Sequence, residues 1–133
     1  MNRVLADSYF FFALVNPRDG AHAKAIDFGR RHRGPLATTA WVLTEVADGL
    51  ASTPRRQVFR RLFEDLEANK ANLIVPANAE MFEKGVELYH SRPDKQWSLT
   101  DCISFVVMPE QRITEALTGD HHFEQAGFTA LLK

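Results

Sequence analysis

Short apolar runs alternate along the chain with longer stretches whose apolar residues recur at helical spacing. The runs at residues 4–6 (Val-Leu-Ala), 36–38 (Leu-Ala-Thr) and 73–75 (Leu-Ile-Val) predict short buried strands, and those at 113–117 and 128–132 predict two more. Amphipathic stretches separate these runs, as they do when helices connect parallel strands. The pattern therefore predicts an α/β fold built on a parallel sheet.

The stretches between these runs predict the helices. They cover residues 21–33, 39–50, a segment that opens at Pro54, 78–90 and 98–108, and a short helix follows Asp7. In the stretch 78–90, Phe82, Val86 and Tyr89 recur at spacings of four and three residues, so we expect them to face the core.

Length and composition describe an ordinary globular domain. The chain has 133 residues, of which 45% are hydrophobic and 25% are charged, and this predicts one domain over residues 1–133. The single cysteine, Cys102, excludes an internal disulfide and fits a reducing compartment. The apolar run at residues 10–15 is too short to cross a bilayer. We therefore expect a cytoplasmic protein that does not associate with membranes.

Four acidic residues occupy positions at which side chains converge in such a fold. Asp7 and Asp120 follow predicted strands, Asp101 lies in the first turn of a helix, and Glu45 borders the apolar stripe of the helix over 39–50. Ligands bind open α/β sheets at the carboxyl ends of the strands. Converging carboxylates repel one another unless a cation lies between them, and Mg²⁺ or Mn²⁺ held in this way assists phosphodiester hydrolysis. Taken singly, each Asp also has a structural interpretation as a helix cap or turn residue.

Ser98 strengthens the structural interpretation of Asp101. The sequence Ser98-Leu99-Thr100-Asp101 resembles a capping box with Asp in place of the usual Glu at its last position.

The positions of the charged residues are more informative about function than the net charge. The formal net charge is -1, which is unlike a dedicated nucleic-acid binder. The basic residues include two groups of arginines, which match phosphate well but also serve as solvated helix faces: Arg30, Arg31 and Arg33, and then Arg55, Arg56, Arg60 and Arg61.

Two histidines follow Asp120. Adjacent side chains are expected to point to different faces, which disfavours a transition-metal site at His121 and His122. His122 is instead a candidate for contact with a substrate phosphate.

Four stretches of the chain resemble the PIN-domain family of nucleases, in particular the toxin ribonucleases of the VapC type. The last two are the most specific, and in order they are residues 4–8 (VLADS), 38–46 (TTAWVLTEV), 97–105 (WSLTDCISF) and 116–128 (ALTGDHHFEQAGF). One departure from the family pattern is the pair Ser8-Tyr9, where Thr-Ser is commoner.

The resemblance implies a three-layer α/β/α fold with a parallel sheet of four or five strands. It also implies an Mg²⁺- or Mn²⁺-dependent endoribonuclease in which the four acids hold the metal and activate water. Ser8, Ser98 and Thr100 would support these acids, and Arg30, Arg31, Arg55, Arg56 and His122 are the candidate substrate contacts.

Further expectations concern the binding partners. The substrate would be RNA of the transfer or ribosomal class, and a small antitoxin protein and a second copy of the chain are candidate partners. Phe10, Phe11 and Phe12 belong either to an antitoxin groove or to the core.

Other functions fit the sequence less well. A haloacid-dehalogenase phosphatase needs a second Asp two residues after the first, and position 9 is Tyr9. A receiver domain needs an acidic pair before its acceptor Asp and a late lysine after a strand, an arrangement that this sequence lacks. The remaining alternative is a non-catalytic PIN-like module that binds RNA or a partner, which would be expected to have lost one of the four acids.

Overall fold

A single parallel sheet forms the centre of the molecule. The computed structural model describes residues 2–32 and 34–133, and in them five strands lie in the order β3-β2-β1-β4-β5. The strands are β1 (Val4–Ala6), β2 (Leu36–Thr39), β3 (Leu73–Val75), β4 (Glu115–Leu117) and β5 (Thr129–Ala130). The parallel sheet and its five strands confirm the predicted fold class.

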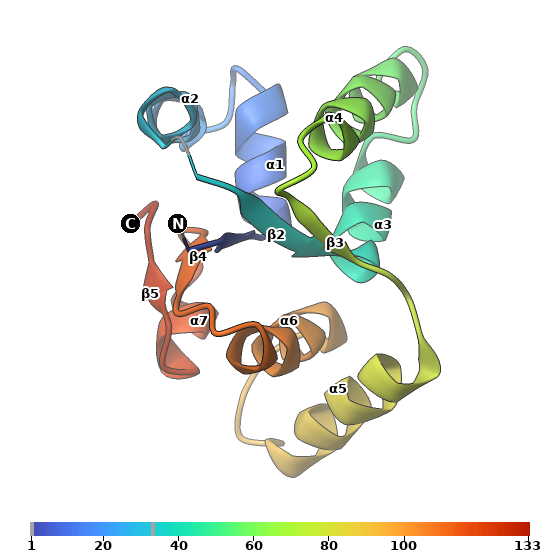
Figure 1. Ribbon diagram of the computed structural model, residues 1–133, viewed down its shortest axis with the longest axis vertical. Coiled ribbons are helices and arrows are strands. Elements are labelled where there is room, and N and C mark those ends of the chain that lie inside the picture. The colour runs from blue at the N-terminus through green and yellow to red at the C-terminus, as the bar shows by residue number, and fades with distance from the viewer. Residues whose placement is uncertain (1, 33) are drawn as a thin grey trace.

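Helices cover both faces of the sheet (Figure 1). One face carries α1 (Ser8–Val15), α2 (His22–Arg31), α3 (Ala40–Gly49) and α4 (Arg56–Ala68), and the other carries α5 (Ala79–Ser91), α6 (Leu99–Glu110) and α7 (His121–Gln125). The expected three-layer α/β/α architecture is therefore present. The helix ends lie within two residues of those predicted from the sequence, the ordinary uncertainty of a helix boundary. None of the helices in the described residues combines the length and the apolar character that crossing a bilayer requires.

The alternation of side chains along β1 divides the core into two parts. Val4 and Ala6 face the side of α1 to α4, whereas Leu5 faces the side of α6 and α7. All three residues are buried, because a parallel sheet is covered by helices on both faces. The strand is therefore apolar throughout and holds the next residue, Asp7, against a rigid centre.

The orientation of α5 differs from the sequence prediction. Phe82 and Tyr89 were expected to face the core, but they are 44% and 48% exposed. The helix instead turns Gly85 toward α6, where a Cβ atom at this position would overlap the Ile103 side chain. The close approach of the two helices outweighs the burial of the aromatic rings, so the small face of α5 packs inward.

Replacing Gly85 by alanine is expected to lower the free energy of unfolding by about 1–3 kcal/mol, because the added methyl group would crowd Ile103. Gly29→Ala in α2 is the matched control, since nothing lies within 4 Å of its Cβ position. The control should be neutral or should raise stability by up to about 1 kcal/mol through helix propensity. Urea denaturation measures both values, and equal effects would contradict the proposed close packing.

Candidate functional site

The strand order fixes where the candidate site forms. From β1 the chain continues to β2 on one side, whereas β4 lies on the other side of β1 and leads to β5. Such a reversal of strand order leaves a crevice at the carboxyl ends of the two central strands. Asp7 follows β1 directly, and Asp120 follows β4 after two residues. The topology therefore brings together residues that are more than a hundred positions apart in the chain.

Thr118 links the two acids at the strand ends. Its buried hydroxyl donates a hydrogen bond to Asp7 Oδ2 at 3.1 Å and accepts one from the Asp120 backbone N–H at 3.0 Å. The side chain thus fixes one carboxylate directly and the other through its backbone. Thr118 was not among the predicted site residues. Its available signal was a hydroxyl residue between the end of a strand and a candidate acid.

The electrostatics of Asp7 show that the acids are near one another. Burial, together with the negative charges of Asp101 and Glu45, raises the pKa of Asp7 to about 7. Hydrogen bonds from the Ser8 backbone and the Thr118 hydroxyl act in the opposite direction. Asp7 is only 4% exposed, so little water reaches its carboxylate to relieve the repulsion.

Asp101 connects Asp7 to Asp120. Burial raises its pKa, and the charge of Asp120 does so as well, whereas hydrogen bonds from Ser98 and the proximity of His122 lower it. The structure therefore brings the four candidate acids into one electrostatic group. In it the charges of Glu45 and Asp101 raise the pKa of Asp7, and the charge of Asp120 raises that of Asp101.

The capping box predicted at the start of α6 is present. Ser98 Oγ accepts a hydrogen bond from the Asp101 backbone at 3.0 Å, and the Ser98 backbone donates to Asp101 Oδ2 at 3.4 Å. The same carboxylate thus caps the helix and faces the other acids, so its structural and functional interpretations are compatible. Ser8 and Thr100 are half-buried and lie next to Asp7 and Asp101 in the chain.

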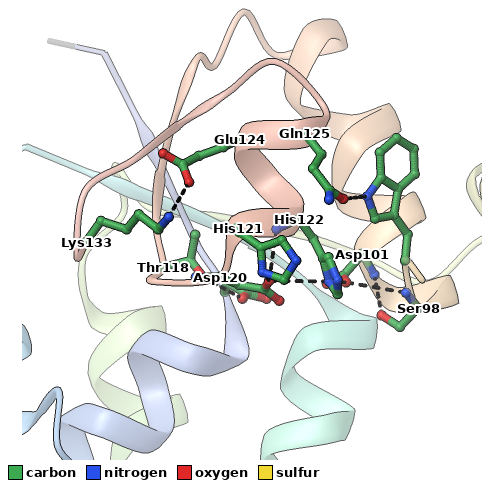
Figure 2. Close-up of polar contacts among 11 residues, drawn as sticks. Ser98, Asp101, Thr118, Asp120, His121, His122, Glu124, Gln125 and Lys133 are labelled. Atoms are coloured by element: carbon green, nitrogen blue, oxygen red, sulfur yellow. Dashed lines mark hydrogen bonds and ion pairs between the residues drawn. The ribbon is translucent and has the colours of Figure 1, made fainter. Parts of the chain in front are cut away.

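The two histidines lie differently from the sequence prediction. Their ring centroids are 4.4 Å apart, and both Nδ1 atoms approach Asp120 Oδ1, His122 at 3.3 Å and His121 at 3.6 Å. Figure 2 shows both rings beside the carboxylates of Asp101 and Asp120. Asp120 caps α7 by accepting a hydrogen bond from the His122 backbone at 2.9 Å, and this turn brings both rings to the carboxylate. The expectation that the rings point to different faces is therefore wrong.

The two arginine groups are not brought to the acids. Arg30 and Arg31 lie at the end of α2, and the chain continues from there to the amino end of β2. The acids lie at the carboxyl ends of the strands, which is the opposite edge of the sheet. Arg31 is exposed and pairs with Asp27 at 2.8 Å. Arg33 lies outside the described residues.

The second arginine group lies beyond the far end of α3. Arg55 and Arg56 are separated from the start of α3 by the whole helix, about 15 Å at 1.5 Å per residue. Arg56 Nη1 donates to the Ala51 carbonyl at 3.2 Å. The structure thus favours the interpretation of these groups as solvated helix faces over that of substrate contacts.

A different set of basic and aromatic residues adjoins the acids. A pocket of about 880 Å³ lies between the end of α5 and the start of α6, and its lining includes Tyr89, His90, Arg92, Lys95, Trp97 and Ser98. The Arg92 guanidinium lies 5.2 Å from the Trp97 ring centroid and pairs with Asp94 at 2.9 Å. Ser98, which lines this pocket, is also the N-cap residue that hydrogen-bonds Asp101, so the pocket adjoins the residue that holds this acid. This pocket was not predicted from the sequence, because the loop at residues 92–97 had only its polar composition as a signal.

Tyr9 lies close to the backbone between Thr118 and Asp120. A Cβ atom at Gly119 would come within 2.5 Å of the Tyr9 hydroxyl oxygen and within 2.6 Å of its ring. The phenol thus packs against a residue that has no side chain, beside two of the acids. This contact explains how the chain accommodates a large residue at position 9.

The chemistry of the acidic cluster fits a hard divalent cation. All four side chains offer carboxylate oxygens, which are the preferred ligands of Mg²⁺ and Mn²⁺. Burial, and then the negative charge of a neighbouring acid, raises the pKa values of Asp7 and Asp101. A cation among these carboxylates would remove that repulsion, so the residues present suit the metal that the sequence resemblance implies.

Comparison with known proteins agrees with this geometry. A family model of the PIN domain matches residues 4–129. The fold is similar to that of VapC20 from Mycobacterium tuberculosis, a sarcin–ricin loop cleaving toxin, with a TM-score of 0.84 and 22% identity over 95% of this chain and 96% of that chain. It is also similar to FitAcB from Neisseria gonorrhoeae, with a TM-score of 0.70 and 15% identity over 96% of this chain and 95% of that chain. No curated protein sequence matches the chain. At these identities, the two structures support the fold.

Replacing Asp7 by asparagine is expected to stabilise the metal-free protein near pH 8. Folded Asp7 holds its proton up to about pH 7, whereas the unfolded chain loses it near the ordinary value of 3.8. Between these values the folded state binds more protons, so the contribution of Asp7 to stability falls as the pH rises. Asparagine does not ionise, so the gain in melting temperature should grow from about pH 5 to about pH 8.

Thermal melts in EDTA across this pH range measure the difference. Asp48→Asn serves as the control, because Asp48 is exposed near the end of α3. Its difference from the unmodified protein should change little with pH. A gain for Asp7→Asn that is constant or that shrinks as the pH rises would show that Asp7 does not titrate abnormally.

Proposed function

The chain belongs to the PIN domain family, and on this premise we propose that it is a metal-dependent endoribonuclease of the VapC toxin type that acts in the cytoplasm. The convergence of four carboxylates at the carboxyl edge of the sheet carries the proposal. A non-catalytic PIN-like module remains the alternative, but the presence of all four acids favours catalysis. We further propose that residues 1–133 act as one nuclease domain.

In this proposal Asp7, Glu45, Asp101 and Asp120 hold Mg²⁺ or Mn²⁺. When bound, the ion would stabilise the negative charge that develops on the phosphate during hydrolysis. Thr118 and Ser98 keep the carboxylates of Asp7 and Asp101 in place through their hydrogen bonds. Such supporting contacts fix the orientation of metal ligands and often affect affinity by 10- to 100-fold.

Glu45 has a different environment from the other three acids. It is exposed, whereas Asp7 and Asp101 are buried and Asp120 is half-buried. Its carboxylate is therefore accessible to solvent and substrate while its charge still acts on Asp7. We infer that Glu45 orients the attacking water, because this role requires a carboxylate that meets the solvent.

The pocket beside Asp101 supports RNA as the substrate. Lys95 and Arg92 bring positive charge to this pocket, and the exposed ring of Tyr89 offers a surface on which a base can stack. We propose that a nucleotide next to the scissile phosphate occupies this pocket. VapC20, which is similar in fold, is a sarcin–ricin loop cleaving toxin. This likeness favours structured RNA, and we propose the ribosomal or transfer class.

The face that α1, α3 and α4 form is the proposed position of an antitoxin. Phe10 and Phe11 are buried and belong to the core, whereas Phe12 is half-buried and lines a pocket of about 370 Å³ with Leu50 and Val58. Of the three phenylalanines, Phe12 is therefore the one available to a partner. A homodimer is a further proposal that rests on the family resemblance alone.

Cleavage of total cellular RNA tests the proposed activity. Purified protein is expected to give discrete fragments with Mn²⁺ or Mg²⁺ and none with EDTA. Asp101→Asn should lower the rate by about 100-fold or more, because it removes a proposed metal ligand. Asp65→Asn, on the exposed surface of α4, is the control and should cleave normally. Cleavage that persists in EDTA and in Asp101→Asn would reject this site.

Lys95→Ala is expected to weaken RNA binding several-fold and to reduce the salt dependence of binding by about one charge. Fluorescence anisotropy measures binding to the RNA that the unmodified protein cleaves. Each protein in this comparison also carries Asp101→Asn, so that the RNA stays intact during the measurement. Lys24→Ala, an exposed change on α2, is the matched control. If the two lysine substitutions weaken binding equally, the pocket has no special part in RNA recognition.

A further inference from the structure

Three consecutive residues place nitrogen donors beside the acidic cluster. We propose that Asp120, His121 and His122 form a mixed nitrogen and oxygen binding position for a first-row transition-metal ion. The proposal goes beyond the hard-cation site of the four acids, and it rests on the proposed function only because Asp120 belongs to both. It predicts that the chain distinguishes ions such as Co²⁺ from Mg²⁺.

The distances between the donor atoms suit a single ion. The carboxylate of Asp120 and one ring nitrogen from each histidine all lie within 4.8 Å of one another. Ligands at about 2.1 Å from a metal ion lie at most about 4.2 Å apart. The donors therefore need to move by only a fraction of an ångström to surround one ion. Asp101 Oδ2, 3.6 Å from His122 Nδ1, lies close enough to take part.

The Nδ1 atom of His122 is the observation that points to a ligand. It is buried, and among the described residues it has no hydrogen-bond partner. A buried polar atom without a partner is costly, and folded proteins rarely leave one. This atom faces Asp120 Oδ1 at 3.3 Å and Asp101 Oδ2 at 3.6 Å (Figure 2). A metal ion between the imidazole and the carboxylates would satisfy all of these atoms together.

His121 provides the second nitrogen from a more accessible position. The residue is exposed, and its Nδ1 atom lies 3.6 Å from Asp120 Oδ1. A surface histidine is free to turn toward solvent, yet this ring lies beside His122 with a centroid separation of 4.4 Å. The two nitrogens thus approach the same carboxylate oxygen from neighbouring positions.

The donor set determines which ions the position prefers. Imidazole nitrogen suits borderline ions such as Co²⁺, Ni²⁺ and Zn²⁺, whereas Mg²⁺ prefers oxygen ligands. Two imidazoles at one position therefore raise affinity for the transition metals and leave that for Mg²⁺ nearly unchanged. The four acids alone would not give this selectivity, because they offer only oxygen.

Metal binding to the purified protein tests this position without reference to RNA cleavage. Isothermal titration with Co²⁺ and with Mg²⁺ near pH 8 would compare the unmodified protein with His121→Gln, His122→Gln and the control His90→Gln. His90 is exposed on α5 and belongs to neither metal position. Each of the first two substitutions is expected to lower Co²⁺ affinity by about tenfold or more, with Mg²⁺ affinity changed by less than about twofold. His90→Gln should alter neither affinity.

A spectroscopic measurement identifies the ligand directly. Electron spin echo modulation of protein-bound Cu²⁺, an ion that imidazole suits, should contain a nitrogen signal that weakens in His121→Gln and His122→Gln. Because His121 is exposed, its substitution tests the position even if His122→Gln does not fold. Bound Cu²⁺ without a nitrogen signal, or Co²⁺ affinity that neither substitution lowers, would overturn the proposal and leave the oxygen site intact.

The remaining outcomes separate this position from the proposed nuclease. A nitrogen signal in a protein that cleaves no RNA would support the position and count against the proposed activity. A folded protein that binds no divalent ion would reject both the position and the metal dependence of the proposed nuclease.

Discussion

Repulsion among four carboxylates is the constraint on which this structure depends. Burial, and then the charge of a neighbouring acid, raises the pKa values of Asp7 and Asp101, so both carboxyl groups have a tendency to lose their charge or turn toward water. The fold counters it with contacts that hold the acids in place. Thr118 fixes Asp7 from the neighbouring strand, and Ser98 fixes Asp101 through the helix cap. Stability is given up locally so that negative charge remains concentrated at one edge of the sheet.

The central strands supply the rigidity for this arrangement. β1 is buried on both faces and pairs with β2 and β4, so the position of Asp7 is set by packing on every side. Helices α3 and α6 begin near the same edge and bring Glu45 and Asp101 from opposite faces of the sheet. Each acid thus comes from a different element, so the site depends on how these elements pack against one another.

The sequence predicted the features that depend on local patterns. Apolar runs located the strands, and the serine and aspartate spacing located the cap of α6. Features that depend on the relation between elements were not accessible in this way. The orientation of α5 follows from the fit of Gly85 against Ile103, and a periodicity based on apolar residues gives a glycine little weight. The distance of Arg31 from the acids follows from topology, and the directions of the histidine rings follow from the turn that Asp120 caps.

The contact between Tyr9 and Gly119 also limits how this sequence can change over time. A side chain at position 119 would collide with the phenol, so that substitution is accessible only after position 9 has become smaller. The change at position 9 can come first, because losing the phenol removes an obstacle and creates none. Two positions that are far apart in the chain thus form a one-way pathway for mutation. A relative with a bulkier residue at position 119 is therefore expected to carry a smaller one at position 9.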